Sequence, residues 1–511
     1  MLQTNEQSTA RFDAGSFRDR SARVFFHEGQ VYRSLSAEGL SDWNAISARP
    51  FFLSAMNEGL IVRTHLLDGQ QTLDLLPVLS RSDHADDSLP LLSAGRMRTR
   101  RIDGQSVSID SPASWQGVLR HERIPVITYP FEWSFEMLKS AALLTLDLLQ
   151  RALADDVILK DATPYNVQFA GTRPTFIDTS SFTPLRPGQA WEGYRQFCQL
   201  FLYPLMLQAY RGVDFQPMLR GRVEGITPRQ MSGLLSFRDT FRAGVFSHVR
   251  LHAKLDHADT ARSASAMQTG VAGSLAEAGF GKDVILNNLR GLQRIIENLN
   301  WQETQSRWIQ YDAASAPVQN DGAAKEIYVS EIVSTRHWNQ VWDIGCNRGR
   351  YSRIAAAQSR CVLAMDIDHL TVNQLYKHLG SDRVGNIIPM VFNLADASPS
   401  LGWNGAERKR LEERSHPDLI LMLAVIHHLV IGENLLLDQV IDWLVARQAS
   451  VVIEFVDRDD PQVQSLLANR TDQFPDYSRE RFERLLTHHF DIQQRWDLPS
   501  KTRSLYYIQP R

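Results

Sequence analysis

Cysteine is scarce in this chain, which carries three in 511 residues. Cys198, Cys346 and Cys361 form no C-x-x-C pair and leave an odd thiol, which suits a reducing cytoplasm. The N-terminus lacks a basic stretch followed by an apolar one, so no secretory signal is expected. No apolar run approaches the length of a membrane helix. The sequence therefore predicts a soluble cytoplasmic protein with no membrane partner.

A strong net charge is also lacking. The formal charge is −3, and the contents of 43% hydrophobic and 22% charged residues are those of ordinary globular proteins. This balance gives no general attraction to nucleic acid or to anionic lipid, so no nucleic-acid partner is expected. Internal repeats are absent, and 511 residues exceed what one core usually supports, so two or three domains are predicted.

The most informative pattern that is present runs from Val341 to Asp368. An apolar strand ends near Asp343, a turn carries Gly345 and Gly349, a helix follows, and a second apolar strand ends at Asp366. Glycines suit a turn pressed against a cofactor, because a Cβ would obstruct the approach. The spacing is G-x-x-x-G and not the G-x-G-x-x-G of pyrophosphate binders. An acidic residue at the second strand end can accept bonds from ribose hydroxyls, so a nucleoside without a diphosphate is predicted.

The residues Asp343 to Gly349 and Asp366 resemble motifs I and II of the class I S-adenosylmethionine-dependent methyltransferases. Later segments agree with this resemblance: 417–429 is typical of a buried strand with its active-site loop, 450–456 of a further strand, and 490–508 of a terminal hairpin. The resemblance covers residues 325–511. It implies an α/β fold with a seven-stranded Rossmann-like sheet whose last strand is antiparallel.

The resemblance also implies where S-adenosylmethionine binds. It places residues around the adenine after the strand-like segment 387–392, where Asp396 can supply the acidic residue that the family often has. The expected cofactor-binding residues are Asp343, Gly345, Cys346, Asn347, Gly349, Asp366, Ile367, Asn393, Leu394 and Ala424. No metal is expected in this domain.

His427 and His428 follow the predicted fourth strand, beside the place where methyl group and acceptor meet. A neutral imidazole there can remove a proton from an acceptor hydroxyl or amine. Successive strand residues point to opposite sides, so at most one is expected to act in this way. The alternative is that each is a structural histidine.

The chain before residue 325 has a different organisation. The predicted divisions are a β-rich small lobe over 1–125, a mainly helical lobe over 126–275, and a helical connector with a linker over 276–324. Apolar residues recur at helical spacing from Phe135 to Leu153. The segment from Ala313 to Asp321 is the best candidate for the linker.

The helical lobe contains Asp161 and Asn166, five residues apart, and Asp178 after a turn and a short strand. This spacing resembles the catalytic loop and metal-binding aspartate of kinase-like folds, closer to aminoglycoside phosphotransferases than to protein kinases. The resemblance implies a two-lobed α+β region with a Mg²⁺ site at Asn166 and Asp178 and an ATP site. Leu159 and Lys160 depart from the pattern, and no Gly-rich loop precedes residue 120. The three residues can instead be turn formers and caps.

The predicted function is methyl transfer from S-adenosylmethionine to an oxygen or nitrogen acceptor, with a kinase-like region that has no catalysis of its own. Two alternatives stay open: a bifunctional enzyme with an active phosphotransferase, and a cofactor-binding scaffold without turnover. The acceptor can be a small molecule, a carbohydrate, a lipid or a protein, and the oligomeric state is not indicated. The charged run from Glu407 to Arg414 is expected to be a solvated helix face or an acceptor-binding lid.

Overall fold

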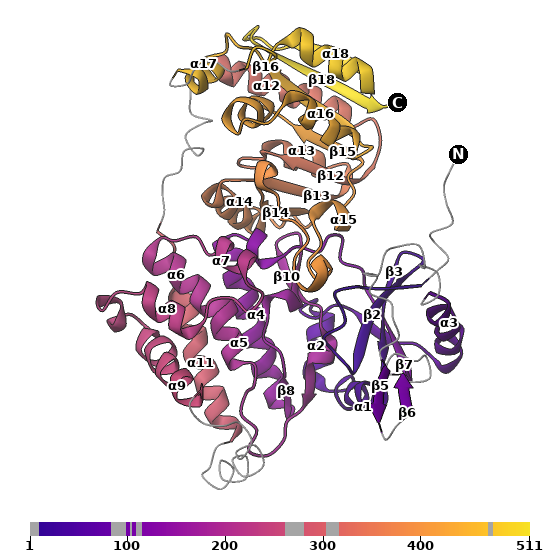
Figure 1. The fold of residues 1–511 in the computed structure, drawn as a ribbon, viewed down its shortest axis with the longest axis vertical. Helices are drawn as coiled ribbons and strands as arrows, with labels where there is room; N and C mark the ends of the chain where they lie inside the picture. The colour runs from indigo at the N-terminus through magenta and orange to yellow at the C-terminus, as the bar shows by residue number, and fades with distance from the viewer. Residues whose placement is uncertain are drawn as a thin grey trace.

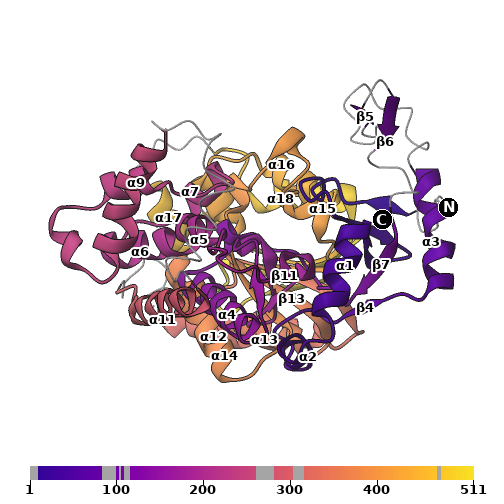
Figure 2. The ribbon, with the colours of Figure 1, turned by 90° about the horizontal axis from the view of Figure 1, so that it is seen from below.

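The computed structural model describes residues 10–82, 99–102, 105–108, 115–260, 281–302, 316–468 and 474–511. A seven-stranded sheet with its helices forms the upper part of the molecule in Figure 1, and residues 10–302, here called the N-terminal region, form the lower part. From below, the small lobe and the helical lobe of the N-terminal region lie on opposite sides (Figure 2).

The small lobe is built on an antiparallel sheet of order β1-β2-β3-β7-β4. Its strands are β1 (Arg11–Phe12), β2 (Ala22–His27), β3 (Gln30–Leu35), β4 (Thr64–Leu66) and β7 (Gly117–His121). Helices α1 (Ala37–Ile46), α2 (Pro50–Asn57) and α3 (Gly69–Ser82) accompany it, and β5 (Thr99–Ile102) pairs with β6 (Gln105–Ser108). The lobe is therefore α+β, since helices separate its strands.

The helical lobe is centred on α4 (Phe135–Ala154), which confirms the predicted helix. Twelve of its residues are buried, because apolar side chains recur around the helix, and α11 (Lys282–Asn298) packs along it. The short strands β8 (Val157–Leu159) and β11 (Phe182–Pro184) pair, as do β9 (Val167–Ala170) and β10 (Arg173–Phe176). The remaining elements are η2 (Pro130–Glu132), η3 (Pro164–Asn166), η4 (Thr179–Ser181), α5 (Tyr194–Phe197), η5 (Cys198–Leu202), α6 (Tyr203–Arg211), α7 (Gln216–Gly221), α8 (Pro228–Leu234), η6 (Arg238–Phe241), η7 (Val245–Arg250) and α9 (Leu251–Thr260).

The C-terminal sheet has the order β14-β13-β12-β15-β16-β18-β17. The strands are β12 (Trp338–Ile344), β13 (Ser359–Asp366), β14 (Ile387–Val391), β15 (Leu419–Met422), β16 (Ser450–Val456), β17 (Phe490–Asp497) and β18 (Arg503–Pro510). The first five are parallel, and β18 pairs antiparallel with both β16 and β17. The predicted seven-stranded α/β sheet is thereby confirmed.

Helices separate the strands of this sheet. They are α12 (Ala316–Val333), α13 (Arg350–Ala356), α14 (His369–Ser381), α15 (Leu411–Arg414), α16 (Leu437–Val445), α17 (Pro461–Leu467) and α18 (Arg479–His489), with the short turns η9 (Leu394–Asp396), η10 (Trp403–Gly405) and η11 (His428–Gly432). Strands β12, β15 and β16 are apolar and almost wholly buried, as expected for parallel strands covered on both faces.

The expected linker is helical over most of its length. Helix α12 begins at Ala316, and residues 313–315 lie outside the described residues. Asp321 is buried, and its carboxylate accepts a hydrogen bond from the backbone N–H of Ser500, in the turn of the β17–β18 hairpin, at 2.8 Å. Asp321 therefore ties the first part of α12 to the turn of the β17–β18 hairpin. Within the described residues, no helix combines the length and the apolar character needed to cross a membrane.

The two parts of the molecule touch closely at α14. The backbone N–H of Glu136, at the start of α4, donates to Asn373 Oδ1 at 2.8 Å, and Tyr376 Oη donates to the carbonyl of Thr172 at 3.0 Å. Gly171, in the β9–β10 turn, lies against Gly385, where an added Cβ would approach the Gly385 carbonyl oxygen to 2.4 Å. A glycine at 171 therefore permits the close backbone approach.

Candidate functional site

The turn after β12 brings backbone into a narrow space at the carboxyl end of the sheet. Gly345, Asn347 and Gly349 all have left-handed backbone, with φ of 73°, 47° and 74°. The N–H groups of Gly345 and Cys346 donate to the Met365 carbonyl of β13, which holds the turn on the sheet. Glycine at 345 and 349 is favoured because other residues adopt this conformation at a cost.

Apolar side chains of the protein lie close to both glycines. A Cβ at Gly345 would approach Val425 Cγ2 to 2.6 Å, and one at Gly349 would approach Leu375 Cδ1, on α14, to the same distance. From the sequence, Gly345 and Gly349 were expected to contact a ligand. In the structure their immediate neighbours are apolar side chains, so Gly349 leaves room for Leu375 of α14 beside the start of α13.

Asp366, at the end of β13, fastens this turn. Its Oδ2 accepts from the Asn347 N–H at 2.8 Å and its Oδ1 from the Asp368 N–H at 2.9 Å. The side chain is buried, and burial raises the pKa of Asp366 above its ordinary value. Each carboxylate oxygen keeps a second lone pair. Ile367, the next residue, exposes 44% of its surface beside it.

Asp343 is a second buried carboxyl group in the turn. Only 1% of it is exposed, and Ser352 Oγ donates to its Oδ2 at 2.5 Å. Burial raises the pKa of Asp343 to about 7, against the hydrogen bond from Ser352 that lowers it. A cation in this neighbourhood would favour the ionised carboxylate.

Two polar atoms around the turn lack a hydrogen-bond partner among the described residues. They are Oδ1 of Asn347 and Oδ2 of Asp368, and both are buried. Asp368 otherwise caps α14 through its Oδ1, which accepts from the N–H groups of Leu370 and Thr371. A buried acceptor without a donor is costly, so these atoms fit a ligand that brings hydrogen-bond donors. Cys346 is buried beside them.

The expected adenine-side residues follow β14. Asn393 Oδ1 accepts from the Ala395 N–H at 2.9 Å and thereby caps η9, which contains Leu394. Asp396, the acidic residue considered for the adenine, is instead paired with Arg220 of α7 at 3.1 Å. Its carboxylate is therefore drawn toward the N-terminal region.

The two histidines do not stand on a strand. Strand β15 ends at Met422, the chain reverses at Ala424 (φ 55°), and His427 and His428 open the helical turn η11. The expectation that they point to opposite sides of a strand is wrong, because the backbone there is helical and their rings lie together, with centroids 4.0 Å apart and planes tilted by 39°. His427 is fully buried, and burial, helped by His428, lowers its pKa well below the ordinary value.

A buried ionic cluster lies at the carboxyl end of β16 and was missed from the sequence. Lys325 Nζ, on α12, contacts Glu454 Oε2 at 2.7 Å, and Arg503, on β18, contacts Glu454 at 3.5 Å and Asp460 at 2.8 Å. All four side chains are at most 8% exposed. The sequence feature that could have revealed this cluster is Glu454, a charged residue inside the apolar run Ser450–Val456.

In the N-terminal region, Asn166 and Asp178 lie close together between the short strand pairs. Asp178 Oδ1 accepts from Arg33 at 2.5 Å and from Ser180 Oγ at 2.8 Å, and its Oδ2 accepts from Ser181 Oγ at 2.5 Å. Asn166 donates to the same Ser181 hydroxyl at 3.3 Å.

The ionisation of the two aspartates in this region differs. Burial acts to raise the pKa of Asp178, but Arg33 and the serine hydroxyls hold it below the ordinary value. Burial and the neighbouring Asp178 raise the pKa of Asp161. Asp178 is therefore an ionised carboxylate that already has a cation, and Asp161 is the more easily protonated of the two.

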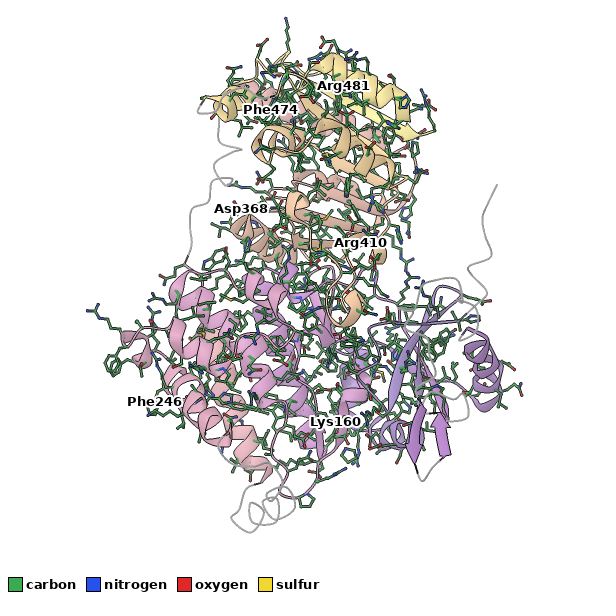
Figure 3. All side chains as sticks on the ribbon, in the orientation of Figure 1. Lys160, Phe246, Asp368, Arg410, Phe474 and Arg481 are labelled. Carbon is green, nitrogen blue, oxygen red and sulfur yellow. The ribbon has the colours of Figure 1, made fainter. Side chains whose placement is uncertain are left out.

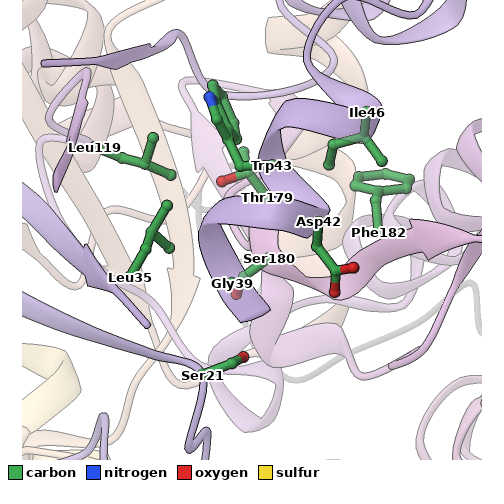
Figure 4. A pocket seen from close by; sticks show the side chains of 10 residues that line it. All are labelled: Ser21, Leu35, Gly39, Asp42, Trp43, Ile46, Leu119, Thr179, Ser180 and Phe182. Carbon is green, nitrogen blue, oxygen red and sulfur yellow. The ribbon is translucent and has the colours of Figure 1, made fainter. Parts of the chain in front are cut away.

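Mg²⁺ does not fit this arrangement as it stands. The carboxylate of Asp178 is occupied by a guanidinium and two hydroxyls, so a metal ion would have to displace Arg33. Among the described residues, no group of three or more His, Cys, Asp or Glu side chains could hold a metal ion. The neighbouring depression beside α1, lined by Asp42, Trp43, Thr179, Ser180 and Phe182 among others, is small and has a mixed polar and apolar lining (Figure 4).

The charged run after η10 is a solvated face only in part, because Arg410 and Glu413 form an exposed pair while other charges of the run contact the N-terminal region. It belongs to residues 398–416, here called the insertion, which joins β14 to β15 and reaches the N-terminal region. The contacts that it makes are Glu407 with Arg18, Arg408 with Tyr165 Oη, Lys409 with Asp13 and with Tyr129 Oη, and Arg414 with Glu132. Arg410 lies at this junction in Figure 3. The charges therefore serve contacts between the two parts of the molecule.

The fold and this site define a class of α/β protein with an open sheet. Its glycine turn and the buried Asp366 meet at the ends of neighbouring strands. Nucleoside ligands usually bind at this place in such sheets. The chain is 32% identical over 498 residues to the nodulation protein NoeA of Rhizobium meliloti (strain 1021), covering 97% of this chain and 95% of that protein. It belongs to the NoeA family. No protein-family model matches the sequence.

Solved structures with a likeness to part of the chain include several methyltransferases. The N-methyltransferase NodS of Bradyrhizobium japonicum WM9 is 14% identical, with 39% of this chain and 99% of that chain covered and a TM-score of 0.28. A SAM-dependent methyltransferase of Aquifex aeolicus is 13% identical, with 41% and 100% covered and a TM-score of 0.28. The bifunctional kinase-methyltransferase WbdD is 15% identical, with 40% and 43% covered and a TM-score of 0.27.

Proposed function

We propose that the chain is an S-adenosylmethionine-dependent methyltransferase. The observation that carries the proposal is the turn Gly345–Gly349, held by the carboxylate of Asp366 at adjacent carboxyl ends of β12 and β13. This is the arrangement in which an α/β sheet offers main chain to a nucleoside and a carboxylate to its ribose.

The residues present fit that cofactor. Asp366 has lone pairs left that can accept hydrogen bonds from the two ribose hydroxyls. The acceptors Asn347 Oδ1 and Asp368 Oδ2 have no hydrogen-bond donor among the described residues, so a ligand can supply one. Asp343 gains a countercharge from a cationic ligand, and Cys346 lies beside the turn. We assign Ile367, Asn393 and Leu394 to the adenine side and Ala424 to the loop that faces the methyl group.

Methyl transfer from a sulfonium requires few catalytic side chains. The sulfonium of the bound cofactor supplies an electrophilic methyl group, so the chain has to align an acceptor oxygen or nitrogen behind it. Alignment of this kind contributes on the order of 7 to 11 kcal/mol. Of the two histidines, His427 is sealed from solvent and His428 is half-buried, so we assign proton removal from the acceptor to His428.

Calorimetry with S-adenosylmethionine and S-adenosylhomocysteine tests the proposal. The full chain should bind both, and Asp366→Ala should weaken binding by about tenfold or more because the ribose loses its acceptor. Asp491→Ala, in an exposed pair with Arg511 in the same domain, is the matched control. Absence of binding, or equal binding by both variants, would contradict the assignment.

The acceptor is the open part of the proposal. Small-molecule, carbohydrate, lipid and protein acceptors are all compatible with a site whose selecting parts are loops, while nucleic acid is not expected. Incubation of the protein with labelled S-adenosylmethionine and fractionated cell extract, followed by mass identification of the labelled product, would name it. Binding without transfer to any fraction would favour the cofactor-binding scaffold.

We further propose that the N-terminal region is a kinase-like fold without phosphoryl transfer. The pairing of Asp178 with Arg33 supports this, because the residue expected to hold Mg²⁺ already has a cation. Calorimetry should detect no Mg²⁺-dependent ATP binding. Tight ATP binding that needs Mg²⁺ and is lost in Asp178→Ala would instead favour the bifunctional enzyme.

A role in nodulation is proposed on the relationship to NoeA alone. Deletion of the gene in its source organism, followed by scoring of nodules on host plants, tests it. Complementation with Asp366→Ala would separate a requirement for cofactor binding from a requirement for the protein.

A further inference from the structure

The helical lobe ends in an exposed aromatic tip, residues 236–242, between α8 and η7. Phe237 and Phe241 are 77% and 81% exposed, and their rings meet edge to face with centroids 5.9 Å apart. Phe246, on η7, is 64% exposed and lies at the outer edge of the lobe, away from the seven-stranded sheet (Figure 3). Exposed apolar groups of this kind mark interaction surfaces.

The tip is firmly built, so the outward aromatic rings belong to the fold. Buried Asp239 accepts from the N–H and Oγ of Ser236 and pairs with Arg242 at 3.1 Å. Arg250 donates to the carbonyls of Leu235 and Ser236 from below. These bonds hold the backbone on both sides of Phe237, so its outward ring stands on an ordered turn.

The stretch of chain that carries the aromatic rings is rich in basic residues. Between residues 211 and 254 the chain has eight Arg and Lys against three Asp and Glu, a net charge of +5 in a chain of net charge −3. Arg238 and Arg229 are exposed and form no ion pair within the described part of the chain. Arg211 and Arg242 pair with Asp239, and Arg220 pairs with Asp396, so Arg229 and Arg238 carry part of the unpaired positive charge of this stretch.

We propose that the aromatic tip and its arginines dock the protein on an anionic lipid surface. Exposed aromatic rings on both sides of the unpaired Arg238 in the chain match an interface that is apolar below and negatively charged above. A second copy of the chain fits less well, because a two-fold contact through the tip would bring Arg238 against its own copy. The proposal does not depend on methyl transfer.

Co-sedimentation of the full chain with large vesicles tests the proposal. The protein should pellet with vesicles of phosphatidylcholine and phosphatidylglycerol, and much less with phosphatidylcholine alone. Added salt should reduce pelleting, because the attraction is partly electrostatic. Equal pelleting with both vesicle types would overturn the proposal.

Substitutions separate the tip from other exposed apolar residues. Phe237→Ser with Phe241→Ser should weaken vesicle binding about tenfold, since two rings no longer enter the interface. Leu73→Ser with Leu436→Ser, which alters leucines 62% and 58% exposed on other elements, is the matched control and should bind as the native chain does. Equal thermal melting of all variants shows that folding is intact.

Two other outcomes would also overturn the proposal. Pelleting without vesicles, or a dimer in gel filtration that the Phe237→Ser and Phe241→Ser change dissolves, would assign the tip to a second copy. Binding of a labelled DNA duplex that requires Arg238, together with no vesicle binding, would assign it to nucleic acid.

Discussion

Asp343 is a carboxyl group that has almost no access to water and whose pKa is raised to about 7 by burial. In the unfolded chain its pKa is about 3.9. The folded protein therefore holds the proton more tightly, and this contribution to stability is lost as the pH rises through the folded-state value.

We expect Asp343→Asn to stabilise the ligand-free protein above pH 7. The gain should be on the order of 1 to 4 kcal/mol and should vanish below pH 4, where the native carboxyl is protonated in both states. Urea unfolding at several pH values measures it. Asp382→Asn, in an exposed ion pair with Arg353, should change stability little at any pH, and a similar pH profile for both variants would contradict the assignment.

The same carboxyl group links cofactor binding to pH. A cationic ligand near Asp343 favours the ionised form, so binding should release protons and tighten as the pH rises through about 7. Calorimetry of S-adenosylmethionine in buffers of different ionisation enthalpy counts the protons. Proton release should disappear in Asp343→Asn, and its persistence there would point to another group.

At the scale of elements, the insertion binds the N-terminal region through α15. Arg414, 6% exposed, pairs with Glu132, whose pKa burial raises and Arg414 lowers. Its guanidinium also donates to the Ile127 carbonyl and lies over the Tyr129 ring.

Arg414→Ala should therefore destabilise the protein by about 3 to 5 kcal/mol at neutral pH, because a buried carboxylate loses its partner. Lowering the pH should recover part of the loss as Glu132 takes up a proton. Chemical unfolding at two pH values measures both effects. Arg410→Ala removes an exposed pair with Glu413 in the same segment and should cost below about 1 kcal/mol.

Local patterns predicted some elements well. Helix α4 and the strands β12 and β13 follow from apolar spacing, and the glycine turn with Asp366 follows from residues within about one supersecondary unit of each other. The histidines were misplaced because apolar residues continue past Met422, and only the reversal at Ala424 shows where β15 stops.

Other features depend on partners far away in the chain. Glu407 to Arg414 has the charge pattern of a solvent-exposed helix, and its partners Asp13, Arg18 and Glu132 are hundreds of residues earlier. The pairing of Arg33 with Asp178 and the cluster around Glu454 likewise join distant segments. Spacing within one segment contains no information about such pairs.

At the scale of the whole molecule, the N-terminal region shields the insertion. In the chain 316–511 alone, Arg408, Lys409 and Arg414 would lose Tyr165, Asp13 and Glu132. Trypsin should then cut the insertion at least about tenfold faster than in the full chain, because local opening becomes easier.

Limited proteolysis with mass identification of the fragments measures this effect. Cutting after the exposed Lys501, in the turn of the β17–β18 hairpin, should be similar in both proteins and serves as the internal control. Equal rates at the insertion would mean that the N-terminal region does not protect it.

The contacts of the insertion also set an order of events during synthesis. Glu132 and Asp13 leave the ribosome long before Arg414 and Lys409, so these two carboxylates have no partner from the insertion until residues 409 and 414 have been made. Domains that emerge first usually fold first. Here the earliest part of the chain reaches its final stability only after one of the latest parts has arrived.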